Sequence, residues 1–408
     1  MRIFEIGTGY TSIPARMGAA TEIVVEELTR SMIGLGYDAT ILDIKDRKRS
    51  QTDLPIIEVY MPQFFSTRNV VKLGLVHKLK RVLYSISLSI KLKNLIKRLP
   101  ADTDYFLHFH NQYNLFFFYL LVPKNLIKRC KVGYTVHSHI WFGEWNTIKR
   151  KVLVSNFQEI YCCKHADKVF VLNEVVARML TDYCNVPSRN IKLVINGVNV
   201  NTYNENSADL IRIKEIKKKY NLENKKIALQ VGSVCERKNQ LGTLLLLTPV
   251  MRNYEDIAFA YAGGIIDMGY QQRIISYARE NSIEDRVVYL GEISPGEELN
   301  IMYTMSDVCF MNSRSEAFAL VIAEALSIPR PIFINEEIMN SLPFLLDHEG
   351  DGIIRIRDSF EKDIINLFKD SVFFNKMKVS GRSFIVNEYS WDKAAIDYLN
   401  TIKSLWEQ

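Results

Sequence analysis

The sequence predicts an α/β protein of two doubly wound domains, and three observations support this fold class. The chain starts with an apolar run at residues 2–6, a glycine-containing loop, a helical pattern at 19–35 and a second apolar run at 39–44. This order of strand, loop, helix and strand is typical of the first half of a doubly wound domain. A polar, charged stretch at 201–224 then precedes another apolar run at 227–231, which suits the opening strand of a second domain. The length of 408 residues is sufficient for two hydrophobic cores.

Composition is that of an ordinary globular protein, with 48% hydrophobic and 24% charged residues. A formal net charge of +6 is compatible with an anionic partner, which could be a nucleotide, a phospholipid surface or nucleic acid. The six cysteines have no C-x-x-C spacing, so we interpret them as reduced thiols. Arg2 and Glu5 interrupt the first apolar residues, which argues against a signal peptide. The longest apolar run, 115–122, is shorter than the roughly 20 residues that span a bilayer, and we expect a cytoplasmic protein.

Residues 306–331 contain the strongest functional pattern of the chain. The apolar residues 308–311 suit a buried strand, and the polar residues 312–315 suit a loop that leads into a helix. The backbone N–H groups of the first helical turn have no partner within the helix and can bind phosphate. They belong to Ala317, Phe318 and Ala319.

Two carboxylates frame that helix. Glu316 stands where loop and helix meet, and Glu324 lies eight positions later, slightly more than two turns at 3.6 residues per turn. If Glu316 belongs to the first turn, both carboxylates point to similar sides. Two solvated glutamates on a helix are the simpler interpretation of this spacing taken alone.

Together with their neighbours, the two glutamates resemble the signature of the group-1 glycosyltransferases. Phe318 lies two places after Glu316, and an Ala-Leu pair follows Glu324. The resemblance implies the GT-B fold, with two Rossmann-like domains facing a cleft, and sugar transfer from a nucleotide-sugar with retention of the anomeric configuration. It implies that Glu316 contacts the donor sugar, that Glu324 holds the ribose hydroxyls, and that the stretch from Ala317 to Leu320 binds the donor. The nucleotide-sugar is a substrate, and the resemblance implies neither a cofactor nor a metal.

The loop after the 227–231 run extends the resemblance. Gly232 and Lys238 match a Gly-Arg…Lys loop whose basic pair grips the donor diphosphate in that family. Ser233 stands at the position of the Arg and is the main departure from the pattern. Arg237 precedes Lys238 and could supply the missing charge, although the direction of its side chain does not follow from the sequence.

The loop after the first strand has two interpretations. Gly7 and Gly9 could begin a dinucleotide fingerprint, but Ser12 replaces its third glycine and no acidic residue ends a strand about 20 positions later, so we disfavour a nicotinamide cofactor. The glycosyltransferase family has a Gly-Gly pair before its first helix, and Gly18 occupies that place here. The resemblance implies that Gly18 faces the donor phosphates or the acceptor. A tight turn that needs glycine is the alternative.

Two predicted strands, 105–109 and 132–136, end in histidines. In open α/β sheets, ligands bind beyond the carboxyl ends of the strands. The family has a strand ending in Thr-x-His whose histidine contacts the donor sugar or the acceptor, and a Thr-Val-His sequence ends at His137. The resemblance therefore implies a catalytic role for His137, and His110 and Asn111 are candidates for the acceptor side. A structural role is the alternative for each histidine, and no Cys or His spacing suggests a metal.

No acidic residue occurs between Glu58 and Asp102, whereas basic residues recur there. They include Lys72, Lys78, Lys80 and Arg81. Apolar residues at three- and four-residue spacing, such as Val76, Leu79 and Ile90, indicate a basic amphipathic segment in two helices. This segment either contacts an anionic membrane surface or packs on the sheet with solvated lysines. The first interpretation gives a peripheral protein on the inner face of the membrane with a lipid-linked acceptor.

We therefore expect a first domain at 1–200, a second domain at 201–386 and a terminal helix at 387–408 that packs back on the first domain, as in the family. A UDP-sugar is favoured as donor, with a GDP-sugar as the alternative. Nucleic acid is not an expected partner, and the oligomeric state is not predicted.

The expected chemistry concerns charge that develops as the glycosidic bond breaks. Lys238 would stabilise the leaving diphosphate, and Glu316 and His137 would orient the sugar. Two alternatives stay open. Ser233 and Ile328, which depart from the family pattern, suggest a non-catalytic partner subunit, and the same fold also serves epimerases that act on the nucleotide-sugar itself.

Overall fold

The computed structural model describes residues 1–14, 20–62, 75–141, 143–316 and 320–407. It forms two compact units, each with its own sheet and core. The N-unit consists of Met1–Asn196 and Trp391–Gln408, and the C-unit consists of Gly197–Ser390. None of the helices within the described ranges is long and apolar enough to cross a membrane.

The N-unit contains a seven-stranded parallel sheet with the order β3-β2-β1-β4-β5-β6-β7. Val, Ile, Phe and Tyr dominate its central strands, as expected for strands covered on both faces. The order reverses between β1 and β4, which makes this pair the topological switch point of the sheet. The strands are β1 (Arg2–Ile6), β2 (Asp38–Ile44), β3 (Ile56–Val59), β4 (Tyr105–Phe109), β5 (Lys131–Val136), β6 (Lys168–Val171) and β7 (Ile191–Leu193).

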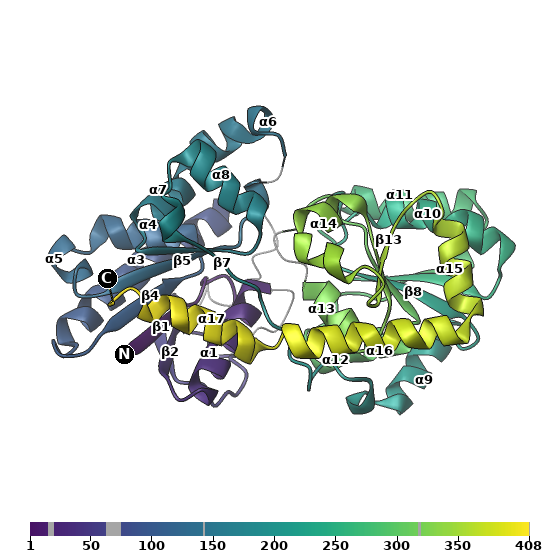
Figure 1. The fold of residues 1–408 in the computed structure, drawn as a ribbon, viewed down its shortest axis with the longest axis horizontal. Helices are drawn as coiled ribbons and strands as arrows, with labels where there is room; N and C mark the ends of the chain where they lie inside the picture. The colour runs from purple at the N-terminus through teal and green to yellow at the C-terminus, as the bar shows by residue number, and fades with distance from the viewer. Residues whose placement is uncertain (15–19, 63–74, 142, 317–319, 408) are drawn as a thin grey trace. The chain divides into compact units, whose positions relative to one another are not determined.

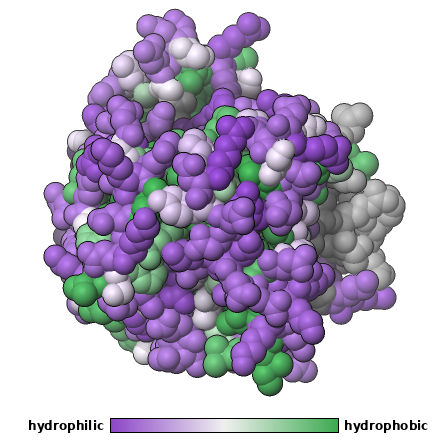
Figure 2. Space-filling view, turned by 90° about the vertical axis from the view of Figure 1, so that its right-hand side faces the viewer, coloured by the Kyte–Doolittle hydropathy of each residue, from purple (hydrophilic) through white to green (hydrophobic). Residues whose placement is uncertain are grey.

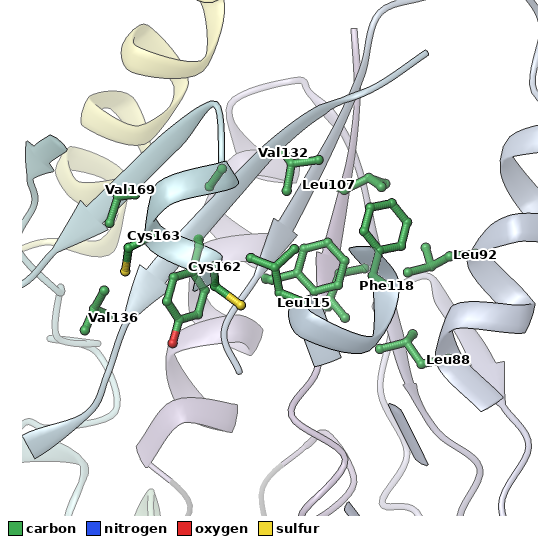
Figure 3. Packing of buried hydrophobic residues seen from close by; sticks show 14 of the residues in the cluster. Leu88, Leu92, Leu107, Leu115, Phe118, Val132, Val136, Cys162, Cys163 and Val169 are labelled. Atoms are coloured by element: carbon green, nitrogen blue, oxygen red, sulfur yellow. The ribbon is translucent and has the colours of Figure 1, made fainter. Parts of the chain in front are cut away.

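Helices cover both faces of this sheet (Figure 1). They are α1 (Ala20–Gly34), α3 (Leu75–Arg98), α4 (Gln112–Leu121), α5 (Lys124–Ile127), α6 (Trp145–Arg150), the π-helical segment η2 (Lys151–Ser155), α7 (Phe157–His165), α8 (Glu174–Cys184) and α17 (Trp391–Lys403). Helices α3, α4 and α7 lie on one face, where their inner side chains meet those of the strands (Figure 3). Cys162 and Cys163 belong to this core, and all six cysteines are free thiols. On the opposite face, α17 packs against α1.

Helix α3 buries a line of side chains that repeats every four residues. The line consists of Tyr84, Leu88, Leu92 and Ile96. The apolar residues singled out in the sequence lie elsewhere on the helix: Leu79 is 51% exposed and Ile90 is 54% exposed. The described part of the 59–100 segment contains this one helix of 24 residues, and residues 63–74 lie outside it.

The prediction that Lys80 faces an anionic surface is wrong. Lys80 belongs to the buried side of α3, and its Nζ donates a hydrogen bond to the Tyr10 carbonyl at 2.9 Å. Burial lowers the pKa of Lys80 to about 8. Arg81 lies over the rings of Tyr10 and Tyr113, at 4.8 and 5.6 Å from their centroids, so Arg81 also packs against Tyr10, the residue that Lys80 binds. Lys72 lies outside the described residues.

The C-unit contains a six-stranded parallel sheet with the order β10-β9-β8-β11-β12-β13, so its switch point lies between β8 and β11. Its strands are β8 (Lys226–Val231), β9 (Ile257–Ala262), β10 (Val287–Tyr289), β11 (Val308–Met311), β12 (Ile332–Ile334) and β13 (Ile353–Arg355). Its helices are α9 (Leu210–Lys219), α10 (Gln240–Asn253), α11 (Met268–Glu280), α12 (Glu297–Met305), α13 (Leu320–Ser327), α14 (Glu336–Ser341), α15 (Phe360–Lys369) and α16 (Ser371–Glu388). The face seen in Figure 2 is mainly hydrophilic, with small, separate hydrophobic groups.

The doubly wound fold predicted from the sequence is confirmed for both units. The terminal helix differs in its start. Residues 387 and 388 complete α16, and a short break precedes α17 at Trp391. Within the N-unit, α17 contributes Tyr398, whose ring packs on those of His108 and Phe170.

Candidate active site

The switch point of the C-unit brings two predicted loops together. Strands β8 and β11 are parallel neighbours, so the loops that follow them lie at the same edge of the sheet. Gly232 follows β8, and the loop from Asn312 to Glu316 follows β11. The N–H of Arg314 donates to the Arg237 carbonyl at 2.8 Å, which ties the two loops to each other.

Two glycines allow the close contacts in this region. Gly232 has φ +149°, and a Cβ there would lie 3.1 Å from the Lys238 side chain. Gly263, at the end of β9, has φ +142°, and a Cβ there would lie 2.2 Å from the Gly232 carbonyl oxygen. Other residues rarely adopt these φ values, so both positions require glycine and Lys238 can lie directly over Gly232.

Two cations share one oxygen of Glu316. Lys238 Nζ lies 2.6 Å and Arg237 Nη1 lies 3.1 Å from Glu316 Oε1. Burial tends to raise the pKa of Glu316, but Lys238 and Arg237 outweigh it and hold the pKa below its usual value. Arg237 also donates to the Ser315 carbonyl at 2.9 Å. The side chain of Arg237 therefore points to the same carboxylate as Lys238, and the group carries an excess of positive charge.

Two buried glutamines hold the first loop in place, and sequence reasoning missed both. Gln230 Nε2 donates to the Lys238 carbonyl at 2.6 Å. Gln240 Nε2 donates to the carbonyls of Gly232 and Ser233, at 3.2 and 3.0 Å. An amide inside an otherwise apolar strand was the available signal for Gln230, because a buried amide needs partners.

Glu324 lies in α13 and is almost fully buried. The Tyr303 hydroxyl donates to Glu324 Oε2 at 2.8 Å. Burial raises the pKa of Glu324, and hydrogen bonds from Tyr303 and Tyr203 together with the charge of Lys238 oppose this shift. Lys238 therefore acts on both glutamates of the motif.

The other predicted donor-binding residues differ in what the structure describes of them. Leu320 is the first residue of α13, whereas Gly18, Ala317, Phe318 and Ala319 lie outside the described residues.

A second cluster lies at the switch point of the N-unit, between β1 and β4. Glu5 on β1 is completely buried. His110 Nε2 lies 2.7 Å from Glu5 Oε2, and His108 Nδ1 lies 3.0 Å from the same carboxylate. His137, just after β5, places its Nε2 at 3.0 Å from His110 Nδ1. The structure thus brings His110 and His137 together and adds Glu5 and His108, which the sequence did not indicate.

The direction of each hydrogen bond follows from Glu5. Burial tends to raise the pKa of Glu5, but His108 and His110 lower it to about 2, so the carboxylate accepts only. His110 then donates through Nε2, and its Nδ1 is an acceptor because burial lowers its pKa to about 4. His137 donates through Nε2 and keeps Nδ1 as an acceptor nitrogen. Burial and His110 hold the pKa of His137 well below its usual range, so the ring is neutral.

Asn111 has a capping role in this unit. Its Oδ1 accepts from the N–H of Tyr113 at 2.9 Å at the start of α4, and its Nδ2 donates to the Tyr10 hydroxyl at 2.8 Å.

Glu5, His108 and His110 are also described residues whose possible ligand atoms are close enough to share a metal ion. Each of these possible ligand atoms already forms a hydrogen bond within the cluster, and these bonds hold the two imidazole rings in fixed orientations.

Two family models match the chain. The model of glycosyl transferases of group 1 matches residues 212–382, which contain Lys238, Glu316 and Glu324. The model of Glycosyltransferase Family 4 matches residues 21–202, which contain the three cluster histidines, His108, His110 and His137. Both halves of the chain thus match glycosyltransferase models, and the half that contains Lys238, Glu316 and Glu324 matches the group-1 model.

Individual relatives of the chain are distant. YtcC of Bacillus subtilis is 25% identical over 222 residues, 52% of this chain and 53% of YtcC. The uncharacterized glycosyltransferase MJ1607 of Methanocaldococcus jannaschii is 22% identical over 243 residues, 59% of this chain and 60% of that protein. The chain therefore spans little more than half the length of these relatives.

The solved structure of Anabaena Alr3699/HepE in complex with UDP and glucose resembles this chain in fold. The TM-score is 0.72, with 14% identity over 99% of this chain and 100% of that chain. The two parallel, Rossmann-like sheets are those of the GT-B fold, as the sequence predicted.

Proposed function

We propose that this enzyme transfers a sugar from a nucleotide-sugar to an acceptor with retention of the anomeric configuration, and that the donor is a UDP-sugar. The observation that carries the proposal is the group of Lys238, Arg237 and Glu316 above Gly232, at the edge of a sheet where ligands of this fold class bind. The likeness in fold to a protein solved with UDP-glucose supports the choice of UDP over GDP.

The chemistry follows from the charges at that edge. As the bond between sugar and diphosphate breaks, negative charge grows on the diphosphate, and preorganised cations stabilise it. Lys238 and Arg237 are in place for this role, and in the free protein Glu316 neutralises part of their charge. A bound diphosphate would take over both cations, which frees Glu316 to orient the donor sugar. Glu324, held by Tyr303, would accept hydrogen bonds from the ribose hydroxyls.

His137 is assigned to orientation of a sugar or acceptor hydroxyl. As a neutral ring with an acceptor at Nδ1, it can receive a hydrogen bond but has no proton to give at that atom. This assignment differs from general acid catalysis, which would need a protonated imidazole.

For the acceptor, we propose a lipid-linked molecule at an anionic membrane surface. Exposed basic residues of α3 support this choice, together with the exposed apolar residues Leu79 and Ile90 beside them. They include Lys78, Lys91, Lys97 and Arg98. Lys80 is excluded from this surface by its burial.

Incubation with labelled UDP- and GDP-sugars, with and without a lipid extract, tests the proposal. We expect label from a UDP-sugar to enter the lipid fraction and UDP to be released in equal amount. Conversion of the sugar without any acceptor would indicate an epimerase instead. If no sugar-nucleotide is consumed with any lipid or soluble acceptor, the chain is a non-catalytic subunit.

A further inference from the structure

The helical layer over one face of the N-unit sheet carries an unusual outer surface. Six large apolar or aromatic side chains on α4, η2 and α7 are exposed, with Leu120 at 64% and Val154 at 65%. The set consists of Leu120, Leu121, Leu153, Val154, Phe157 and Tyr161, and we call it the α4–η2–α7 surface. Singly exposed apolar residues are common, but a contiguous group points to an interaction site.

Helix α7 contacts both α4 and η2, and ring contacts join the aromatic members of the group to α4. The Phe116 ring on α4 lies 5.7 Å from that of Phe157 and 5.4 Å from that of Tyr161. Tyr119 lies 6.1 Å from Tyr161 on the same seam. The opposite sides of the helices are committed to the core: Leu115 and Phe118 of α4 and Cys162 of α7 are buried there (Figure 3). The exposed side chains therefore lie outside the buried core that these helices form with the sheet.

The π-helical segment sets the centre of this surface. Val152 is completely buried, so the next two side chains, Leu153 and Val154, turn outward. Basic residues flank them on both sides along the chain: Lys149, Arg150 and Lys151 directly before, and Lys164 after Tyr161. All four of these basic residues are exposed.

Acidic residues are almost missing from this part of the chain. Residues 105–166 contain eight Lys and Arg but only two Asp and Glu. One of the two, Glu159, is 1% exposed and accepts a hydrogen bond from the Tyr134 hydroxyl at 3.0 Å. The other, Glu144, is exposed. The surface therefore combines an apolar centre with a basic rim in which basic residues far outnumber exposed acids.

We propose that the α4–η2–α7 surface docks on an anionic lipid bilayer. The apolar side chains would enter the boundary between headgroups and acyl chains, and Lys149 to Lys151 and Lys164 would contact lipid phosphates. A second copy of the chain is a poorer occupant, because a two-fold interface sets identical basic rims against each other. The inference deepens the proposed function, since it gives a lipid-linked acceptor a defined membrane contact beyond α3.

The test is flotation of the full chain with vesicles of phosphatidylcholine alone or with one third phosphatidylglycerol, at low and high salt. One variant, the apolar double, carries Leu153→Gln and Val154→Gln together. A second variant, the basic triple, carries Lys149→Gln, Arg150→Gln and Lys151→Gln together. Matched controls on the C-unit are Val372→Gln with Val379→Gln, both strongly exposed, and the α9 triple Lys217→Gln, Lys218→Gln and Lys219→Gln. Melting temperature and UDP affinity are measured for every variant.

We expect the wild type to prefer anionic vesicles, and the basic triple to weaken this binding on the order of 100-fold at low salt. The apolar double should abolish the binding that survives high salt, whereas both control variants should bind as the wild type does. Equal, negligible binding of the wild type to both vesicles overturns the inference. Loss of binding in the control variants also overturns it, as does a loss that is confined to a variant with Lys91→Gln and Lys97→Gln on α3. A change of oligomeric state in the apolar double without a change in vesicle binding assigns the surface to a second copy. UDP affinity separates the two proposals: if UDP fails to bind, the donor assignment fails whatever the vesicles show.

Discussion

At the scale of single residues, the group of Lys238, Arg237 and Glu316 contains two cations that are not equivalent. Lys238 is the closer partner of Glu316 and the less exposed one, with 13% of its side chain accessible against 34% for Arg237. A charge held in a less solvated position acts more strongly on a developing anion. Lys238 should therefore be the main stabiliser of the leaving diphosphate.

Substitution at both positions tests this ranking. Lys238→Ala should lower kcat/KM by about 100-fold, which corresponds to roughly 3 kcal/mol of transition-state stabilisation, and Arg237→Ala should lower it by about tenfold. Steady-state kinetics with the preferred donor give both values. A larger loss in Arg237→Ala would show that Arg237 has taken the role of the Arg that Ser233 replaces.

Glu5 determines which ring nitrogens carry protons in the N-unit cluster, and Glu5→Gln should disturb this pattern. A glutamine replaces one of the two acceptor oxygens with an NH2 donor, so His108 or His110 loses the oxygen to which it donates. We expect a tautomer change that reaches His137, a loss of about tenfold or more in turnover, and unchanged UDP affinity. Nitrogen NMR shifts of His137 report the tautomer directly. Unaltered shifts together with normal turnover would refute the positioning role.

The motif glutamates could be predicted from the sequence because their pattern is local. The Glu5 cluster could not, because its hydrogen bonds join residues that are 103 and 105 positions apart and only the sheet order brings them together. Three further residues were not predicted for a related reason. Gln230 and Gln240 donate to backbone carbonyls and Tyr303 donates to a carboxylate, and no spacing in the sequence predicts such contacts.

At the scale of elements, α3 shows why periodicity alone can mislead. Apolar residues form two lines on this helix, one through Leu79 and Ile90 and one through Leu88 and Leu92, and both have helical spacing. Contact with the sheet selects the second line, and Lys80 shares it because its long side chain can reach the Tyr10 carbonyl. Strand positions were predicted more accurately, because continuous apolar runs mark strands that are buried on both faces.

The close approach of the chain after β9 to the chain after β8 depends on glycine, and Gly263→Ala tests this dependence. The added Cβ would meet the Gly232 carbonyl, a backbone atom that cannot rotate away, at a φ that alanine rarely adopts. We expect the C-unit to lose about 2–4 kcal/mol of stability. Gly291→Ala is a useful comparison, since it has a positive φ but no atom within 4 Å of the added Cβ. Equal destabilisation of the two variants in urea unfolding would mean that strain alone, without the clash, accounts for the effect.

At the scale of the whole molecule, buried carboxyls make the stability of the N-unit depend on pH. Burial raises the pKa of Glu22 and of Glu159 to about 7, from ordinary values near 4.5. Groups with a raised pKa contribute stability that is fully present below about pH 4.5 and is lost as the pH rises through 7. Each could account for up to about 3 kcal/mol. Glu5 acts in the opposite sense, because its lowered pKa gives stability that disappears as the pH falls from 4.5 toward 2.

Calorimetry at pH 5, 6.5 and 8 tests the first of these effects. The wild-type N-unit should melt at a lower temperature as the pH rises, and the double variant Glu22→Gln with Glu159→Gln should be much less sensitive. Asp102→Asn, at an exposed position, is the control and should follow the wild type. A double variant as sensitive as the wild type would show that other groups control the pH dependence.

Both sheets repeat one plan, with candidate site residues at the point where the strand order reverses: Glu5 and His110 in one, Gly232 and Glu316 in the other. The account of the donor site rests on the second of these points. Titration calorimetry with UDP and GDP, on the wild type and on Glu324→Ala, measures it most directly. We predict that UDP binds more tightly than GDP and that Glu324→Ala weakens UDP binding by at least tenfold, since a charge-assisted pair of hydrogen bonds to ribose is lost. Wild-type protein that binds neither nucleotide, or a Glu324→Ala variant with full UDP affinity, would contradict the account.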